Sequence, residues 1–179
     1  MKKIIYWMVV GCFTITILGC SVTATTDEDK PSAGQQAFEK NSKSVMDYIN
    51  AWENEDVDYD RFFAQDYESW GTAFGDSDTT RLEQMKESNQ RLFNAYDFKV
   101  VTDPINLLPG VDNDTKEIDG SVRVYYEWAI TKTATDSTEA KTGNLKMYQA
   151  YVFNDEGKIT LHLTYGDFGG LLDYLNSED

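Results

Sequence analysis

Two stretches in the second half of the chain alternate apolar and polar residues with a period of two. One face of the first carries Val122, Val124, Tyr126, Trp128 and Ile130, and one face of the second carries Leu145, Met147, Gln149, Tyr151 and Phe153. Because successive side chains of a β-strand point to opposite faces, this spacing predicts two long strands that each bury one face. Similar patterns at Phe98–Val101 and Ile159–Tyr165 add two strands, so a four-stranded antiparallel meander is expected.

The chain before these strands has helical spacing instead. Ser32 and Gln35 have the spacing of a capping box, and the apolar residues that follow predict a helix from about Gly34 to Glu53. A second box, Thr80 with Glu83, predicts another helix, whose apolar side carries Leu82, Met85, Leu92 and Tyr96. A short strand is expected over residues 67–74 and an amphipathic tail over Leu171–Leu175. Helices followed by an antiparallel sheet predict an α+β fold with the helices on one face.

The N-terminus has the pattern of a secretory signal. Lys2 and Lys3 precede an apolar stretch, Ile4–Leu18, which is short for a membrane span. The stretch ends in Gly19-Cys20 and resembles the lipobox of bacterial lipoproteins, which implies cleavage before Cys20 and acylation of its thiol and new amine. The expected organisation is a signal peptide over 1–19, a flexible polar tether over 20–33 and one domain over 34–177. In the lipoproteins that the chain resembles, an Asp after the cysteine favours retention in the inner membrane, so the resemblance with Ser21 at this position implies the outer membrane of the bacterial cell envelope.

Composition excludes several kinds of chemistry. The chain has 179 residues, enough for one domain, and a formal net charge of -15, which disfavours binding to nucleic acid. Cys12 leaves with the signal and Cys20 carries lipid, so the mature domain has no thiol to use. A single histidine cannot build a multi-histidine metal site, and the sequence has no glycine-rich phosphate loop. We therefore expect no cofactor and no metal.

Two segments, "YINAWENEDVDYDRFFAQDY" early and "YVFNDEGKITLHLTYGD" late, resemble the nuclear transport factor 2-like (SnoaL-like) superfamily. The resemblance covers roughly Phe38 to Leu175. It implies a curved antiparallel sheet wrapped around the N-terminal helices, forming a cone with a cavity. Many members bind a small apolar molecule there, and others are isomerases, dehydratases or cyclases.

The ketosteroid isomerase branch of this superfamily allows a comparison by position. Tyr48 matches its oxyanion-binding tyrosine on the first helix. Gln149 stands where that branch has a protonated aspartate, and an amide cannot act as that acid does. Trp70 and Gly71 stand where it has its proton-abstracting aspartate. Proton transfer needs a group that titrates near the working pH, so steroid-isomerase chemistry is not expected here, although the pocket is.

His162, the only histidine, has two possible orientations. Alternation along Ile159–Tyr165 places the apolar residues on the core face and His162 toward solvent. The register of the resemblance instead places His162 in the cavity. An apolar outer face and a cavity-facing His162 are compatible if the second face of the sheet is also covered. The cover would be either the C-terminal segment or a homodimer packed through the convex sheet face.

Three functions remain open from the sequence. The first is a membrane-anchored module that binds a small, largely apolar ligand or a protein partner. The second is a lyase or isomerase with His162 as base and Tyr48 as proton donor, and the third is a structural subunit of an envelope complex. The candidate ligand-binding residues are Tyr48, Trp52, Trp70, Tyr126, Trp128, Met147, Gln149, Tyr151 and His162.

Overall fold

The computed structural model describes residues 30–75, 79–134 and 139–177. The expected signal peptide, most of the tether and Cys20 lie outside these residues. A compact unit begins at Pro31 and runs to the C-terminus. None of the helices in the described part of the chain is long and apolar enough to cross a membrane.

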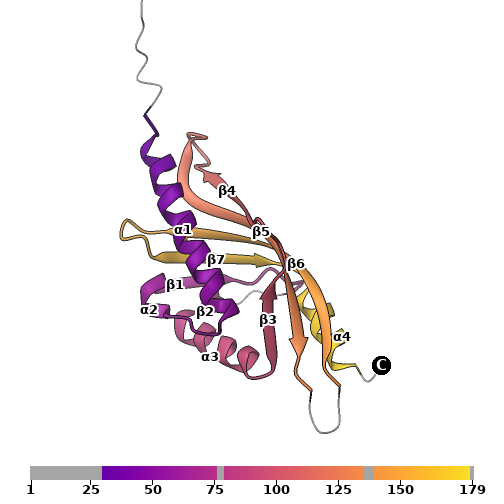
Figure 1. Ribbon diagram of the computed structural model, residues 1–179. Helices are drawn as coiled ribbons and strands as arrows, with labels where there is room; N and C mark the ends of the chain where they lie inside the picture. Colours follow the sequence, from indigo (N-terminus) through magenta and orange to yellow (C-terminus); the bar gives the residue numbers. More distant parts are fainter. Residues whose placement is uncertain (1–29, 76–78, 135–138, 178–179) are drawn as a thin grey trace, which may run out of the picture. The chain divides into compact units, whose positions relative to one another are not determined.

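The described part of this unit contains four helices and seven strands (Figure 1). The helices are α1 (Ala33–Glu53), α2 (Tyr59–Phe62), α3 (Leu82–Phe93) and α4 (Phe168–Asn176). The strands are β1 (Phe63–Trp70), β2 (Thr79–Arg81), β3 (Tyr96–Val100), β4 (Asn106–Val111), β5 (Ile118–Lys132), β6 (Lys141–Phe153) and β7 (Ile159–Tyr165). They form one curved sheet in the order β2-β1-β7-β6-β5-β3, with β4 also paired to β5. Helix α1 crosses one face of this sheet, which confirms the predicted α+β fold.

The sheet differs from the predicted antiparallel meander in two places. Strands β1 and β7 pair in parallel, with Ser69 opposite His162, because the last strand lies between β6, its neighbour in sequence, and the first strand. Strand β4, which contains Pro109 and Gly110, was not predicted. Among the described strands it pairs with β5 alone, and such an edge strand tolerates a proline because no partner on its outer side requires the N–H that proline lacks.

The inner faces of β5 and β6 form the main core, as the alternation predicted. Val122, Val124, Tyr126, Trp128 and Ile130 on β5 are at most 5% exposed, and Leu145, Met147, Gln149 and Tyr151 on β6 are at most 6% exposed. Helix α1 covers them with Val45, Tyr48 and Ile49. Its N-terminal half lies so close to β5 that a Cβ on Gly120, whose φ is +82°, would come within 2.7 Å of the Cβ of Ala37. The Asn41 amide donates to the Gly120 carbonyl here, at 2.9 Å.

The two predicted helix starts have different outcomes. The Gln35 N–H donates to the Ser32 hydroxyl at 3.1 Å, which confirms Ser32 as the cap of α1. The second box is wrong by one position, because Thr80 belongs to β2 and the Arg81 N–H donates to the Gln84 side-chain oxygen at 2.9 Å. Strand pairing between β1 and β2 holds Thr79–Arg81 extended, so α3 begins at Leu82. Tyr96 lies in β3 rather than on the helix, and it is buried.

Candidate functional site

A cavity of about 210 Å³ lies between the helices and the inner face of the sheet. Its apolar and aromatic lining residues are Tyr48 and Trp52 from α1, Tyr67 from β1, Met85 and Leu92 from α3, Phe98, Trp128, Met147, and Phe168 from α4. The other lining residues are polar but uncharged or weakly basic: Ser69, Thr80, Ser88, Asn89, Gln149, His162 and Thr164. No Asp, Glu, Lys or Arg of the described ranges lines the cavity. Among the described residues there is also no cluster of His, Cys, Asp and Glu that could hold a metal ion.

His162 lies inside the protein, facing this cavity from β7. It is 7% exposed, so the alternation-based expectation of a solvent-facing histidine is wrong and the register of the resemblance is right. Leu163 and Tyr165 point to the opposite, outer face of the sheet, where Tyr165 is 49% exposed. The alternation of apolar and polar residues predicted the wrong inner face for β7. This strand places its polar residues inward, where they meet hydrogen-bonding partners on the neighbouring strands.

The His162 ring is held on both nitrogens. Its Nε2 lies 3.0 Å from the Thr164 hydroxyl, and its Nδ1 lies 3.5 Å from the Tyr67 hydroxyl. Its cross-strand neighbour Tyr151 stacks on the ring, with centroids 4.5 Å apart and an interplanar angle of 9°. Burial lowers the pKa of His162 from 6.5 to about 4, because the charged form loses solvation when the ring is removed from the surface. The imidazole is therefore neutral at pH 7.

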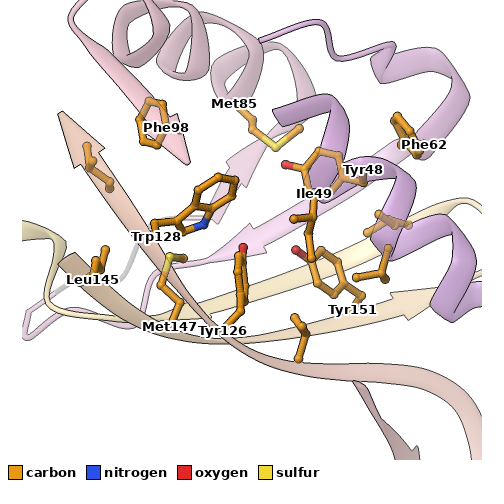
Figure 2. Close-up of a cluster of buried hydrophobic side chains, with 14 of the residues drawn as sticks. Tyr48, Ile49, Phe62, Met85, Phe98, Tyr126, Trp128, Leu145, Met147 and Tyr151 are labelled. Carbon is orange, nitrogen blue, oxygen red and sulfur yellow. The ribbon is translucent and has the colours of Figure 1, made fainter. Parts of the chain in front are cut away.

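Gln149 is the centre of a buried hydrogen-bond network. Its side-chain oxygen accepts from Tyr126 at 2.6 Å and from Tyr151 at 2.7 Å, and its amide nitrogen donates to Thr164 at 3.2 Å. Strand register explains the arrangement, because Gln149 lies opposite Thr164 and shares a face with Tyr151 two residues along. Figure 2 shows the Tyr126 and Tyr151 rings side by side beneath α1. Burial raises the pKa of both tyrosines, so their hydroxyls keep their protons.

Tyr48 presents a hydroxyl group without a hydrogen-bond partner in the described part of the chain. Its ring is fixed by edge contacts with Phe63 at 5.1 Å and with Tyr151 at 6.1 Å between centroids. Figure 2 shows the hydroxyl on the side of the ring that faces Met85 and Trp128, two other lining residues. Burial raises the pKa of Tyr48, and the nearby phenol of Tyr67 raises it further.

The structure brings most of the sequence-derived candidates together. Tyr48, Trp52, Trp128, Met147, Gln149 and His162 line the cavity. Tyr126 and Tyr151 lie behind this lining and hold Gln149. Trp70 does not reach the cavity: it is 51% exposed, and its indole N–H donates to Glu68 at 3.3 Å. Because side chains alternate along β1, the neighbouring Ser69 faces inward and Trp70 faces outward.

Several lining residues were not among the candidates. They are Tyr67, Ser69, Thr80, Met85, Ser88, Asn89, Leu92, Phe98, Thr164 and Phe168. Alternation could have identified Thr164, because it shares the face of β7 that carries the candidate His162. Phe168 and the polar residues of α3 carried no comparable signal, since only the tertiary packing brings those helices to the cavity.

The outer face of the sheet carries an aromatic row. Tyr148 of β6 lies between Tyr125 of β5 and Tyr165 of β7, with ring centroids 4.7 and 5.8 Å away. Tyr125 and Tyr165 are about half exposed, and Trp70 lies on the same side of the sheet. This is the surface on which the sequence predicted a homodimer, and the homodimer stays a prediction.

No protein-family model and no curated protein matches the sequence. The fold does match solved structures. A candidate polyketide cyclase from a Silicibacter species is 16% identical, with a TM-score of 0.59 over 78% of this chain and 98% of that one. One from Xanthomonas campestris is 20% identical, with a TM-score of 0.56 over 78% and 96% of the two chains.

An LEH-like epoxide hydrolase from M. tuberculosis is 18% identical, with a TM-score of 0.53 over 77% of this chain and 86% of that one. At these identities the likeness concerns the fold alone. The chain therefore has the curved α+β fold of the SnoaL-like, nuclear transport factor 2-like proteins.

Proposed function

We propose that the cavity binds a small, uncharged and largely apolar molecule and does not convert it chemically. One observation carries this proposal: the lining combines aromatic walls with neutral polar groups and has no ionised side chain in the described residues. A buried charge on a ligand would find no countercharge there, and burying an unpaired charge is costly. Aromatic walls, by contrast, bury apolar ligands, and sparse polar groups orient them.

The size of the cavity limits the ligand to about one substituted ring. Its volume of about 210 Å³ is below the range of roughly 300–1,000 Å³ that is common for pockets that bind drug-sized ligands. An engineered apolar cavity of about 150 Å³ holds benzene, so a benzene ring with a short substituent fits here. A molecule with several fused rings would require the lining side chains to move.

A lyase or isomerase is the alternative, and one observation favours it. His162 and Tyr48 line the same cavity, as a base and a proton donor must, and solved structures with this fold include candidate polyketide cyclases and an epoxide hydrolase. Efficient acid–base catalysis needs a pKa near the working pH, however. Burial takes the pKa of His162 to about 4, and no carboxylate of the described residues lines the cavity. These facts support binding over catalysis.

Tryptophan fluorescence tests the binding proposal directly. Replacing Trp7 and Trp70 with phenylalanine leaves Trp52 and Trp128, both in the cavity lining, as the only tryptophans of the full chain. We expect ethylbenzene to change their fluorescence in a saturable way and benzoate to have no effect, because the cavity offers no countercharge. The same chain with Ser88→Phe, which fills part of the cavity, should lose the response. An unchanged response in that variant would place binding elsewhere, and release of an altered ring compound would favour the enzyme.

We further propose that lipid on Cys20 holds the domain at the bacterial envelope, on the outer membrane. The support comes from the sequence: an apolar stretch after two lysines ends in Gly19-Cys20, and a polar segment follows. In cells fed with labelled palmitate, the full chain should carry the label and fractionate with membranes. Cys20→Ser should abolish labelling, and Cys12→Ser should not. Equal labelling of the Cys20→Ser chain would contradict the anchor.

A further inference from the structure

Within the hydrogen-bond network around His162, one hydroxyl proton has no acceptor. Both tyrosine protons of Tyr126 and Tyr151 go to the Gln149 oxygen, and the Gln149 amide donates to Thr164. Two bonds remain, one between the Thr164 hydroxyl and the His162 Nε2 and one between the Tyr67 hydroxyl and the His162 Nδ1. A neutral imidazole has one proton and one free lone pair, so it donates in one of these bonds and accepts in the other.

In each of the two neutral tautomers of the imidazole, one hydroxyl proton is left without an acceptor. If Thr164 donates to Nε2, then Nδ1 donates to Tyr67, and the Tyr67 proton is unused. If Nε2 donates to Thr164, then Tyr67 donates to Nδ1, and the Thr164 proton is unused. Both hydroxyls belong to residues that line the cavity, so the spare proton is available to a ligand. Burial raises the pKa of Tyr67, and the Ser69 hydroxyl offsets part of this rise, which fits a donor directed at the Tyr67 oxygen.

Tyr48 of α1 supplies a second spare proton to the same cavity. Its hydroxyl has no partner in the described residues, and its pKa is raised by burial and by Tyr67, so it stays protonated. The strong acceptors nearby are already engaged: the Gln149 oxygen binds two hydroxyls, and both nitrogens of His162 have hydroxyl neighbours. This side of the cavity therefore offers protons and has few lone pairs to receive one.

We propose that the ligand is a neutral one-ring carbonyl compound, an aryl ketone or aldehyde, whose oxygen accepts from Tyr48 and from the spare proton of the Tyr67–His162–Thr164 group. A carbonyl oxygen has two lone pairs and brings no proton of its own, so it satisfies both donors. Its ring lies against Trp52, Trp128 and Met147. This inference rests on the proposed binding function and names the chemical class of the ligand.

Three matched probes test the inference in the Trp7→Phe, Trp70→Phe chain: acetophenone, 1-phenylethanol and ethylbenzene. They share the ring and a two-carbon substituent and differ in the oxygen. We expect acetophenone to bind roughly tenfold more tightly than ethylbenzene, because the oxygen gains one or two hydrogen bonds at net strengths typical of proteins. The affinity for 1-phenylethanol should lie between those for acetophenone and ethylbenzene. The carbonyl infrared band of bound acetophenone should move to lower frequency than in hydrocarbon solvent.

Tyr48→Phe is the deciding variant, and it is expected to fold because the hydroxyl it removes bonds to nothing in the described structure. It should remove most of the preference for acetophenone and leave ethylbenzene binding unchanged. Tyr174→Phe, at a half-exposed position of α4, is the matched control and should change neither. Equal affinities for the three probes, or equal weakening of acetophenone and ethylbenzene by Tyr48→Phe, would overturn the carbonyl assignment while binding itself stands. Failure of all three probes to bind would overturn both the proposed function and this inference.

Discussion

Gln149→Leu is expected to destabilise the fold by about 2–6 kcal/mol. Leucine fills a similar volume but takes away the acceptor of two buried hydroxyl protons, those of Tyr126 and Tyr151. Each buried donor left without a partner costs about 1–3 kcal/mol, since it has lost water and gained nothing in return. Both hydroxyls lie in the core between α1 and the sheet, so neither can reach solvent by a small movement of its side chain. Urea unfolding of the purified protein, followed by far-UV circular dichroism, measures the loss.

The control removes the donors together with the acceptor. In a triple variant, Tyr126→Phe and Tyr151→Phe accompany Gln149→Leu, so no hydroxyl is left unpaired at that point. Apolar replacement of all partners is close to neutral in general, so most of the lost stability should return. If the triple variant is as unstable as Gln149→Leu alone, the cost comes from the shape of leucine and the network contributes little. A change in the denaturant slope would instead indicate a change in the unfolded state.

The strands of the core could be predicted from the sequence because their alternation is long and nearly uninterrupted. Every β5 residue from Val122 to Ile130 on the predicted inner face is buried. On β6, the predicted inner face is buried from Leu145 to Tyr151. The parallel pairing of β1 with β7 could not be predicted in the same way. It joins segments far apart in the chain, and local periodicity contains no information about which strands become neighbours.

The candidate site shows why a correct strand does not guarantee a correct face. Residues 67–74 were expected to include a strand, and Trp70 was chosen from it by position. In β1 the inward residues are Tyr67 and Ser69, because a shift of one residue exchanges the two faces of a strand. His162 was ambiguous for the opposite reason: β7 has apolar residues on one face and hydrogen-bonding residues on the other. Only the partners supplied by Thr164, Tyr67 and Tyr151 make the polar face the buried one.

Acidification should destabilise the protein through His162 by about 3 kcal/mol. The pKa of this histidine is about 4 in the folded protein and near 6.5 once the chain unfolds, so the unfolded chain binds the extra proton between these values. The stabilisation from the neutral, buried imidazole is thus complete above pH 6.5, declines as the pH falls from 6.5 to 4, and is lost below 4. The difference between the folded and unfolded pKa values corresponds to about 3 kcal/mol of folding stability, at 1.36 kcal/mol per pKa unit.

Urea unfolding of wild type and His162→Gln at pH 7 and pH 4 isolates this contribution. The carboxylates of the chain titrate in both proteins, so their effect cancels in the difference, whereas glutamine has no proton to gain. The wild type should lose about 3 kcal/mol more than the variant over this interval. Because His162 is the only histidine, its single imidazole Cε1–H resonance in NMR reports the folded-state pKa directly. A midpoint near 6.5, with equal acid sensitivity of the two proteins, would mean that water reaches the ring. The cavity would then contain the titratable base that the alternative enzymatic function requires.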